Sequence, residues 1–179
     1  MSILEGIRKK VESCRKCDLW LTAKRAVPGE GPSDSPLMII GEAPGATEEK
    51  MGRPFVGRAG RILRDALERH GIKEAYITNV VKHRPPRNRR PNSQEVAACS
   101  KFLQQEMYTI RPRVILALGR TAAEYFGIKS KLSEVSGKPF EINGIKVIPC
   151  YHPAAVLRNP KLANSFNLAM EAARAEIQD

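Results

Sequence analysis

The stretch from Leu37 to Gly45, with the sequence Leu-Met-Ile-Ile-Gly-Glu-Ala-Pro-Gly, constrains the fold more than any other part of the chain. Its first four residues are apolar, which predicts a short buried strand. Gly41 then permits a backbone geometry that other residues avoid, and Pro44 with Gly45 predicts a sharp turn. Glu42 is therefore expected at the carboxyl end of a strand, where open α/β sheets form their ligand crevices.

Two more polar side chains occupy the same kind of position. Asn79 follows the strand-like run Tyr76–Thr78, and His152 follows Val147–Tyr151. Any one of these residues alone is best interpreted as an ordinary polar residue at the end of a strand. The coincidence of three polar strand ends in one small basic domain indicates a functional site.

Short apolar runs alternate along the chain with segments of helical periodicity. A chain of 179 residues is long enough for one domain with a substantial core and short for two. We therefore expect, over residues 1–179, a single three-layer αβα domain with a central, mainly parallel sheet of about four strands. The pair Asn143–Gly144, flanked by alternating residues, predicts a hairpin over 140–147. The expected strands are 37–40, 75–81, 114–118 and the hairpin arm that runs on to 151; the expected helices are 3–13, a turn at 47–50, 59–69, 92–107, 121–126 and 162–177, with 19–36 irregular.

The charge balance limits the classes of partner. The chain has 30 Lys and Arg against 19 Asp and Glu, a net charge of +11. Such an excess favours polyanions, with nucleic acid first, although a basic surface or adaptation to heat would give the same totals. No apolar run approaches the ~20 residues of a membrane span, and the N-terminus lacks the pattern of a secretory signal. We expect a cytoplasmic, nucleoid-associated protein that binds no membrane.

The most basic segment of the chain is Lys82–Pro91, in which five of ten residues are Lys or Arg and three are Pro. The prolines exclude a helix and a central strand, so the segment is predicted to be a loop. It is either a charged surface loop or a loop that follows phosphates. Its stiffness, and its place directly after the strand that carries Asn79, favour phosphate binding.

Four cysteines lie at positions 14, 17, 99 and 150. In a reducing compartment structural disulfides are not expected, and Cys14-Arg15-Lys16-Cys17 has the spacing of a pair of metal ligands. A redox pair has the same spacing, but such a pair usually opens a helix just after a strand, and no strand is predicted before Cys14.

Several motifs occur together in an order that is typical of one family. They are Gly41-Glu42-Ala43-Pro44-Gly45, Gly52-Arg53-Pro54-Phe55-Val56-Gly57, Thr78-Asn79-Val80-Val81-Lys82, and Tyr151-His152-Pro153 with Leu157-Arg158. With them, the chain closely resembles a family 4 uracil-DNA glycosylase, the prokaryotic, often thermophilic, iron–sulfur branch of its superfamily. The resemblance extends from Cys14 to about Pro160.

The resemblance implies a hydrolase of base excision repair, which cleaves the N-glycosidic bond between uracil and deoxyribose and leaves an abasic site. The nucleotide must first be flipped into a pocket, because a base inside a duplex is unreachable. Phe55 would stack on the extruded ring, unless it is a core residue, and Asn79 would read the Watson–Crick edge of uracil. His152 would stabilise the charge that develops on the departing base.

The same resemblance makes Glu42 the candidate that orients or deprotonates the attacking water. Other branches of the superfamily use an aspartate at the position of Ala43, so Glu48 stays open as a second candidate. Glu48 would otherwise exclude the methyl group of thymine or be an exposed residue at a helix start. Gly41, Ala43 and Pro44 are expected to line the substrate pocket.

The family's DNA contacts map onto two segments. Arg84, Arg87 and Asn88 of the basic loop are the expected phosphate contacts, and Arg158 would contact phosphate after the His152 motif. Leu157 would enter the base stack as a wedge, unless it packs into the core.

Family 4 proteins hold a [4Fe–4S] cluster with four cysteines, of which Cys14, Cys17 and Cys99 match. His83 stands at the fourth position, and imidazole can replace thiolate at iron. Three alternatives stay open: Cys150 as the fourth ligand, zinc in a Cys3His site, or a labile cluster with three ligands. Cys150 is expected to be free and buried. The metal would tie the N-terminal helix to the basic loop.

A second class of function also fits these residues: a non-catalytic or altered-specificity nucleic-acid-binding iron–sulfur module of the same fold. The expected partner in either case is DNA, uracil-containing for the enzyme, single or double stranded. No segment demands a sliding clamp or a polymerase as a partner, and we expect a monomer.

Overall fold

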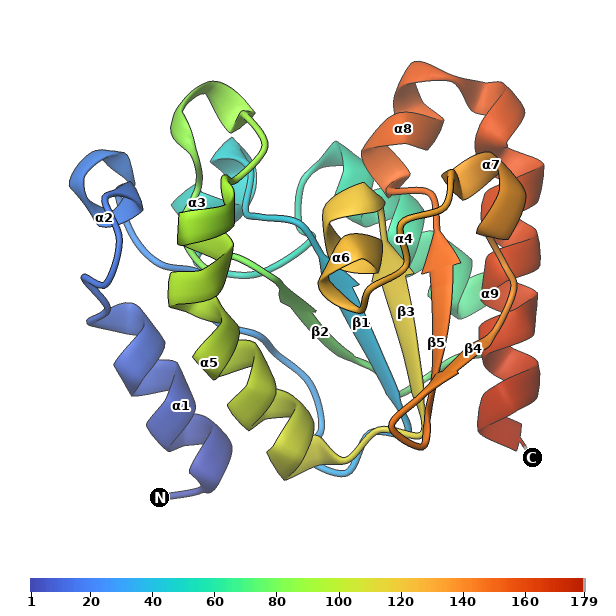
Figure 1. Ribbon diagram of the computed structural model, residues 1–179, viewed down its shortest axis with the longest axis horizontal. Helices are drawn as coiled ribbons and strands as arrows, with labels where there is room; N and C mark the ends of the chain where they lie inside the picture. The colour runs from blue at the N-terminus through green and yellow to red at the C-terminus, as the bar shows by residue number, and fades with distance from the viewer. Residues whose placement is uncertain (179) are drawn as a thin grey trace.

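The computed structural model describes residues 1–178, which form a five-stranded sheet with helices on both faces (Figure 1). The strand order is β2-β1-β3-β5-β4. All neighbouring strands pair in parallel except β4, which is antiparallel to β5. The strands are β1 (Leu37–Gly41), β2 (Tyr76–Asn79), β3 (Val114–Leu118), β4 (Phe140–Ile142) and β5 (Ile145–Cys150).

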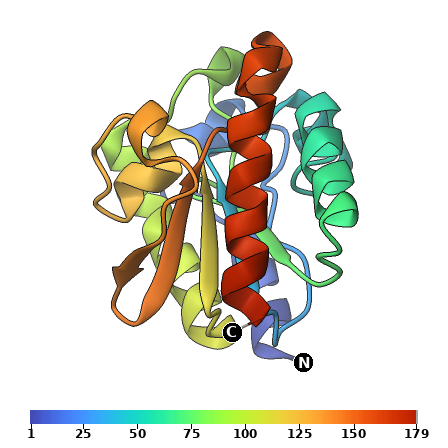
Figure 2. The same ribbon diagram turned by 90° about the vertical axis from the view of Figure 1, so that its right-hand side faces the viewer.

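The helices divide between the two faces. On one face α4 (Arg58–Arg69) and α9 (Ala163–Gln178) pack on the sheet, and Figure 2 shows α9 in front of it with α4 alongside. The other face is covered by α5 (Ser93–Ile110), α6 (Arg120–Tyr125) and α7 (Leu132–Val135), with α1 (Ile3–Glu12) outside α5. The remaining short helices are α2 (Leu19–Thr22), α3 (Ala46–Met51), α8 (Pro153–Arg158) and the 3-10 turns η1 (Pro86–Asn88) and η2 (Pro160–Leu162).

The apolar run of β1 is continuous because both of its faces are covered. Leu37 and Ile39 belong to the core under α4 and α9, whereas Met38 and Ile40 belong to the core under α5 and α6. Each of these four side chains is fully buried. Side chains alternate between the faces of a strand, so a strand that is covered on both sides reads as a nearly continuous apolar run.

The connections place a crevice at one end of the sheet. The chain passes from β1 to β2 on one side of β1 and then to β3 on the other side, so the direction of winding reverses between β1 and β3. In doubly wound sheets the ligand crevice lies outside the carboxyl ends of the strands at this switch point. Glu42 follows β1, and Gly119 follows β3.

The fold class predicted from the sequence is confirmed, with local differences. The fifth strand is the first arm of the predicted hairpin, whose turn residues Asn143 and Gly144 both have positive φ. Because these residues are in the conformation of a tight primed turn, β4 folds back on β5 and is antiparallel at the sheet edge. Strand β2 ends at Asn79 and not at residue 81, and the segment 19–36 contains the helix α2, whose Leu19 is buried in the core.

Among residues 1–178, no helix combines the length and the apolar character needed to cross a bilayer.

Candidate active site

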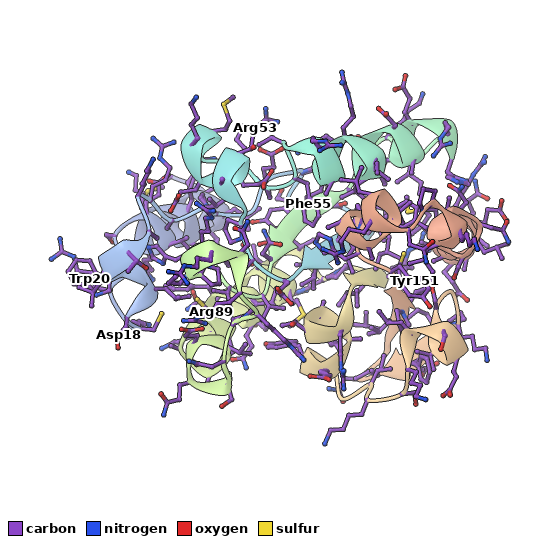
Figure 3. All side chains as sticks on the ribbon, turned by 90° about the horizontal axis from the view of Figure 1, so that it is seen from above. Asp18, Trp20, Arg53, Phe55, Arg89 and Tyr151 are labelled. Atoms are coloured by element: carbon purple, nitrogen blue, oxygen red, sulfur yellow. The ribbon has the colours of Figure 1, made fainter. Side chains whose placement is uncertain are left out.

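A cavity of about 460 Å³ opens at the carboxyl ends of the strands, at the switch point. Figure 3 looks down on these strand ends, and the labelled Phe55, Arg89 and Tyr151 surround the region of the cavity. The three predicted strand-end residues Glu42, Asn79 and His152 all line it. Its other lining residues are Ala43, Pro44, Gly45, Glu48, Phe55, Ala59, Gly60, Pro85, Asn88, Arg89, Leu118, Gly119, Arg120, Leu132, Tyr151, Ala154, Ala155 and Arg158.

Asn79 is the last residue of β2, and its side chain is 2% exposed. Its Oδ1 atom has no hydrogen-bond partner among the described residues. A buried amide oxygen without a partner costs free energy, and such atoms are rare in folded proteins. The oxygen is therefore well placed to accept a hydrogen bond from a ligand.

Gly41 lets Asn79 and Phe55 approach the end of β1. A Cβ atom at this position would lie 2.5 Å from Asn79 Oδ1 and 2.5 Å from Phe55 Cζ. Contacts this short do not occur, so any side chain at Gly41 would displace one or both residues. Gly41 thus shapes the cavity wall through the space that it leaves.

Phe55 is 5% exposed and belongs to the core under α4, although it also lines the cavity. The interpretation of Phe55 as a core residue is therefore confirmed, and its stacking on an extruded base stays a prediction. Its φ of 51° is in the left-handed region, which a non-glycine residue adopts only under constraint. Gly60 supplies part of that constraint, because a Cβ there would lie 2.1 Å from the Phe55 carbonyl carbon.

An ion-pair network fixes the same loop from outside. Arg64 donates from Nε to the Phe55 carbonyl at 2.8 Å and from Nη2 to Glu30 at 2.8 Å. Glu30 also accepts two hydrogen bonds from Arg53, at 2.8 and 2.9 Å. Burial raises the pKa of the Glu30 carboxyl, but the hydrogen bonds from Arg53 and Arg64 more than offset this, so the pKa is lowered. The carboxylate therefore stays ionised and holds both arginines.

Glu48 joins the two loops at the mouth of the cavity. Its Oε1 accepts from the Gly45 N–H at 3.2 Å, and its Oε2 accepts from the N–H groups of Val56 and Gly57 at 3.0 and 2.6 Å. Both oxygens are thus engaged by backbone donors, and the side chain is half-buried and not exposed. These bonds favour a role in positioning the Phe55 loop over a role in activating water.

His152 caps α8, and its geometry fixes its tautomer. Its Nδ1 accepts the N–H of Ala154 at 3.0 Å, so in the neutral ring the proton is on Nε2. Burial, with a smaller contribution from the nearby charge of Arg158, lowers the pKa of His152 to about 4. At neutral pH His152 is therefore an uncharged N–H donor. Its ring lies 5.5 Å from the ring of Phe55, centroid to centroid.

The basic loop divides into buried and exposed members. Lys82, one of the five cations counted from the sequence, is fully buried and cannot contact phosphate. Arg84 donates to Asn88 Oδ1 at 2.7 Å, and Asn88 lines the cavity. Arg87 is exposed, with a positive φ of 55°.

The two predicted DNA contacts after His152, Leu157 and Arg158, both have exposed side chains. Leu157 is 39% exposed, and the neighbouring Val156, which is 9% exposed, packs into the core in its place. Arg158 is exposed at the cavity rim. The alternative that Leu157 is a core residue is therefore wrong.

The four cysteines are free thiols, and Cys150 is buried as expected. Burial raises the pKa of the Cys99 thiol, Lys82 acts in the opposite direction, and the neighbouring Cys17 and Cys14 contribute to raising it, which places the three cysteines near one another. His83 is buried too, which lowers its pKa, with Glu49 acting in the opposite direction. Within residues 1–178, no three His, Cys, Asp or Glu side chains are grouped so that they could hold a metal ion.

Zinc and an iron–sulfur cluster place different demands on these residues. Zinc needs its four donors around one ion, at about 2.0–2.3 Å. An iron–sulfur cluster carries its ligands on separate iron atoms, so the cysteines stand further apart. The three neighbouring free thiols, together with His83, are the residues that would hold either group.

Sequence reasoning missed several residues of the site. Thr121 donates from its hydroxyl to Glu42 Oε2 at 2.5 Å, and Arg90 donates to Thr121 at 2.9 Å. The network of Glu30 and Arg64 was also missed. No local pattern marks these residues, because each acts on a partner that is more than 30 positions away.

Comparison with known proteins agrees with this geometry. Residues 28–174 match the model of the uracil DNA glycosylase superfamily. The chain is 47% identical over 180 residues to a type-4 uracil-DNA glycosylase of Pyrobaculum aerophilum, which covers 93% of this chain and 92% of that protein. It is 45% identical over 162 residues to a type-4 uracil-DNA glycosylase of Thermotoga maritima, covering 88% and 84%. A type-5 uracil-DNA glycosylase of Pyrobaculum aerophilum is more distant, at 31% identity over 189 residues, covering 94% and 80%. The chain therefore belongs to the uracil-DNA glycosylase superfamily, and within it to the type-4 branch.

Proposed function

We propose that this protein excises uracil from DNA by hydrolysing the N-glycosidic bond, which leaves an abasic site. The observation that carries the proposal is the Asn79 side chain, which lines the cavity and whose buried Oδ1 has no hydrogen-bond partner among the described residues. An amide offers an acceptor and a donor side by side, which complements the N3–H and O4 of uracil. Cytosine has an acceptor at N3 and an amino group at C4. Its acceptor would face the amide oxygen of Asn79, and its amino group would face the amide N–H. A ligand that leaves the buried polar groups of a site without hydrogen bonds binds far more weakly than one that pairs with them.

The cavity suits a base that has left the duplex. Uracil in a helix is stacked and unreachable, so the nucleotide must rotate out into the cavity. The Phe55 ring in the cavity wall supplies an apolar surface for the extruded base. The exposed Leu157 fits the role of the wedge that holds the gap, and Arg87 and Arg158 supply exposed positive charge for phosphates.

The polar residues fit the charges of the reaction. The bond between C1′ and N1 breaks with its electron pair going to uracil, while the sugar becomes cationic. The Nε2–H of neutral His152 donates to the uracil O2, on which the negative charge develops. The Glu42 carboxylate favours the cationic sugar and accepts a proton from water as the water oxygen bonds to C1′. Glu42 then releases the proton to solvent and the uracil anion takes one up, so the products are free uracil and an abasic site with a hydroxyl on C1′.

We propose further that Cys14, Cys17 and Cys99, with His83 as the fourth ligand, hold a [4Fe–4S] cluster. The neighbouring free thiols and the names of the type-4 relatives support this assignment. Bound there, the cluster would act as a covalent cross-link between the segment after α1, the basic loop and α5. In this way the N-terminal helix becomes part of a single domain over residues 1–179. Zinc bound by the same residues is the alternative, and the measured iron and zinc contents of the protein decide between the two.

The natural substrate is uracil in either single- or double-stranded DNA. We propose a monomer that acts in the cytoplasm at the nucleoid, where reducing conditions keep the thiols available for metal. Neither a clamp nor a polymerase is needed for the chemistry.

The test uses a labelled oligonucleotide with one uracil, incubated with the metal-loaded protein and then treated with alkali. Scission at uracil, without scission of matched thymine and cytosine oligonucleotides, is expected. The variant Asn79→Leu, which keeps the volume and removes both polar groups, should lose cleavage, and Glu42→Gln should cleave slowly while still binding the oligonucleotide. Tight binding without any cleavage by the wild-type protein would overturn the enzyme and favour a nucleic-acid-binding module. Iron and zinc contents of the same sample decide between the metals.

A further inference from the structure

Three side chains from three segments form a continuous hydrogen-bonded chain behind the cavity. Arg90 of the basic loop donates from Nε to Thr121 Oγ1 at 2.9 Å, and Thr121 donates from Oγ1 to Glu42 Oε2 at 2.5 Å. Thr121 is in the first turn of α6 and is only 5% exposed. The basic loop is therefore linked to the candidate water-activating carboxylate through one buried hydroxyl.

The direction of this chain follows from the chemistry of its members. A guanidinium group has only donors, and an ionised carboxylate has only acceptors. The Thr121 oxygen must therefore accept from Arg90, and its single proton must point to Glu42. Without Arg90, the hydroxyl would be free to rotate and to donate elsewhere. The guanidinium thus fixes the hydroxyl, and the hydroxyl fixes the carboxylate.

Arg90 is itself held in place. Its Nη2 atom pairs with Glu124, which also accepts a hydrogen bond from Arg120 at 2.8 Å. Burial raises the pKa of Glu124, but the hydrogen bonds from Arg120 and Arg90 more than offset this, so the pKa is lowered. Glu124 therefore stays ionised and anchors the guanidinium on α6.

We propose that Thr121 is a positioning residue for Glu42 and that Arg90 couples the basic loop to the same carboxylate. The hydroxyl engages Oε2 and prevents the carboxylate from rotating, which leaves Oε1 to take the water that attacks C1′. This inference rests on the proposed function and adds a part to it: the loop expected to hold DNA also sets the geometry of the chemical step. Arg90 then acts on the rate of bond cleavage and not only on DNA affinity.

The experiment is single-turnover cleavage of a uracil oligonucleotide over a range of protein concentrations, which separates the maximal rate from the half-saturating concentration. Thr121→Val keeps the shape and removes the hydroxyl, and it should lower the maximal rate about tenfold or more, the value of one charge-assisted hydrogen bond. The half-saturating concentration should change by less than about twofold. Thr121→Ser retains the hydroxyl and should restore the rate to within about threefold of wild type.

Three further variants complete the design. Thr109→Val removes a hydroxyl that donates only to the Gln105 carbonyl within α5, so it is the matched control and should cleave normally. Arg90→Met should slow cleavage more than it weakens binding, and it tests the coupling even if Thr121→Val does not fold. Arg87→Ala removes an exposed arginine of the same loop and should weaken binding more than it slows cleavage.

The outcomes separate this inference from the proposed function. No uracil cleavage by the wild-type protein overturns the proposed function itself. Wild-type cleavage that Glu42→Gln slows strongly, combined with an unchanged maximal rate in Thr121→Val, overturns only the role of Thr121. If Thr121→Val adds a full tenfold loss on top of Glu42→Gln, the two residues act independently and the coupling is wrong, because members of one unit are non-additive.

Discussion

Replacement of Lys82 by Met should destabilise the protein severely, although a cation in a basic loop is usually dispensable. Lys82 is fully buried, and its Nζ donates to Thr78 Oγ1 at 2.5 Å, to the Asn79 carbonyl at 2.8 Å and to Glu106 Oε2 at 2.7 Å. Glu106 is 1% exposed and also accepts from the Tyr76 hydroxyl at 3.0 Å. Methionine fills the volume of the lysine stem but leaves the carboxylate buried without its counter-charge.

The magnitude follows from the burial of both partners. Removal of one partner of a buried ion pair costs about 3–5 kcal/mol, mostly from the charge that is left behind. For a chain of this size, this corresponds to a fall in melting temperature of about 6–20 °C. The double variant Lys82→Met/Glu106→Gln removes the orphaned charge and retains an acceptor for Tyr76, so it should recover most of the loss. The surface pair Arg8–Glu12, with side chains 52% and 50% exposed, provides the control. Arg8→Met should cost less than about 1 kcal/mol.

The assay is urea unfolding, followed by circular dichroism, on samples with equal metal content. The reasoning is refuted if Lys82→Met loses no more stability than Arg8→Met, or if the double variant is less stable than Lys82→Met alone. A functional readout accompanies it. Because Nζ holds the Asn79 carbonyl, the single variant should also weaken discrimination of uracil from cytosine at temperatures where it is folded.

Three further predictions concern the cavity. Because burial lowers the pKa of His152 to about 4, the ring stays neutral as the pH falls from 7 to 5. The rate of cleavage should therefore not fall near pH 6.5 through protonation of His152. A fall there in the wild type that is absent from the His152→Asn variant would contradict this. The His152 ring binds a proton at higher pH in the unfolded chain than in the folded protein, so the free energy of unfolding should fall as the pH drops from about 6.5 to about 4. Thermal unfolding of the wild type and the His152→Asn variant over this pH range would measure the fall. Gly41→Ala should cripple cleavage because its methyl group meets Asn79 and Phe55 at 2.5 Å, whereas Gly6→Ala on α1, with no atom within 4 Å of the added carbon, should be neutral. Leu157→Ala should change the unfolding free energy by less than about 0.5 kcal/mol, since the side chain is 39% exposed, yet lower cleavage in duplex more than in single-stranded DNA; equal losses in both would contradict the wedge.

Local patterns in the sequence were sufficient to predict the longer elements and the three strand-end residues. The start of α5, predicted at residue 92, is a clear case, because Asn92 and Glu95 form a capping box with bonds of 2.9 Å in both directions. The hairpin at Asn143–Gly144 was predicted in the same way. Both signals are complete within a few residues, so no knowledge of the rest of the molecule is needed to interpret them.

The sequence was misleading where a residue's surroundings contradict its type. Lys82 lies among arginines and prolines, in the loop predicted to bind phosphates, yet it is fully buried beside Glu106. Glu48 has the appearance of a helix-start carboxylate that is free to react, but three backbone N–H groups occupy its two oxygens. Each result depends on a partner that only the folded chain brings near.

The sequence by itself thus determined the doubly wound sheet, the carboxyl-end position of Glu42, Asn79 and His152, and the motifs that identify the family. Tertiary structure alone decided the unpartnered oxygen of Asn79 and the link from Arg90 through Thr121 to Glu42. The physical reason is the distance along the chain between the residues that interact. Periodicity and capping are set by neighbours along the chain, whereas hydrogen bonding and the pKa of a buried group depend on atoms within a few ångströms in space, whatever their distance in sequence.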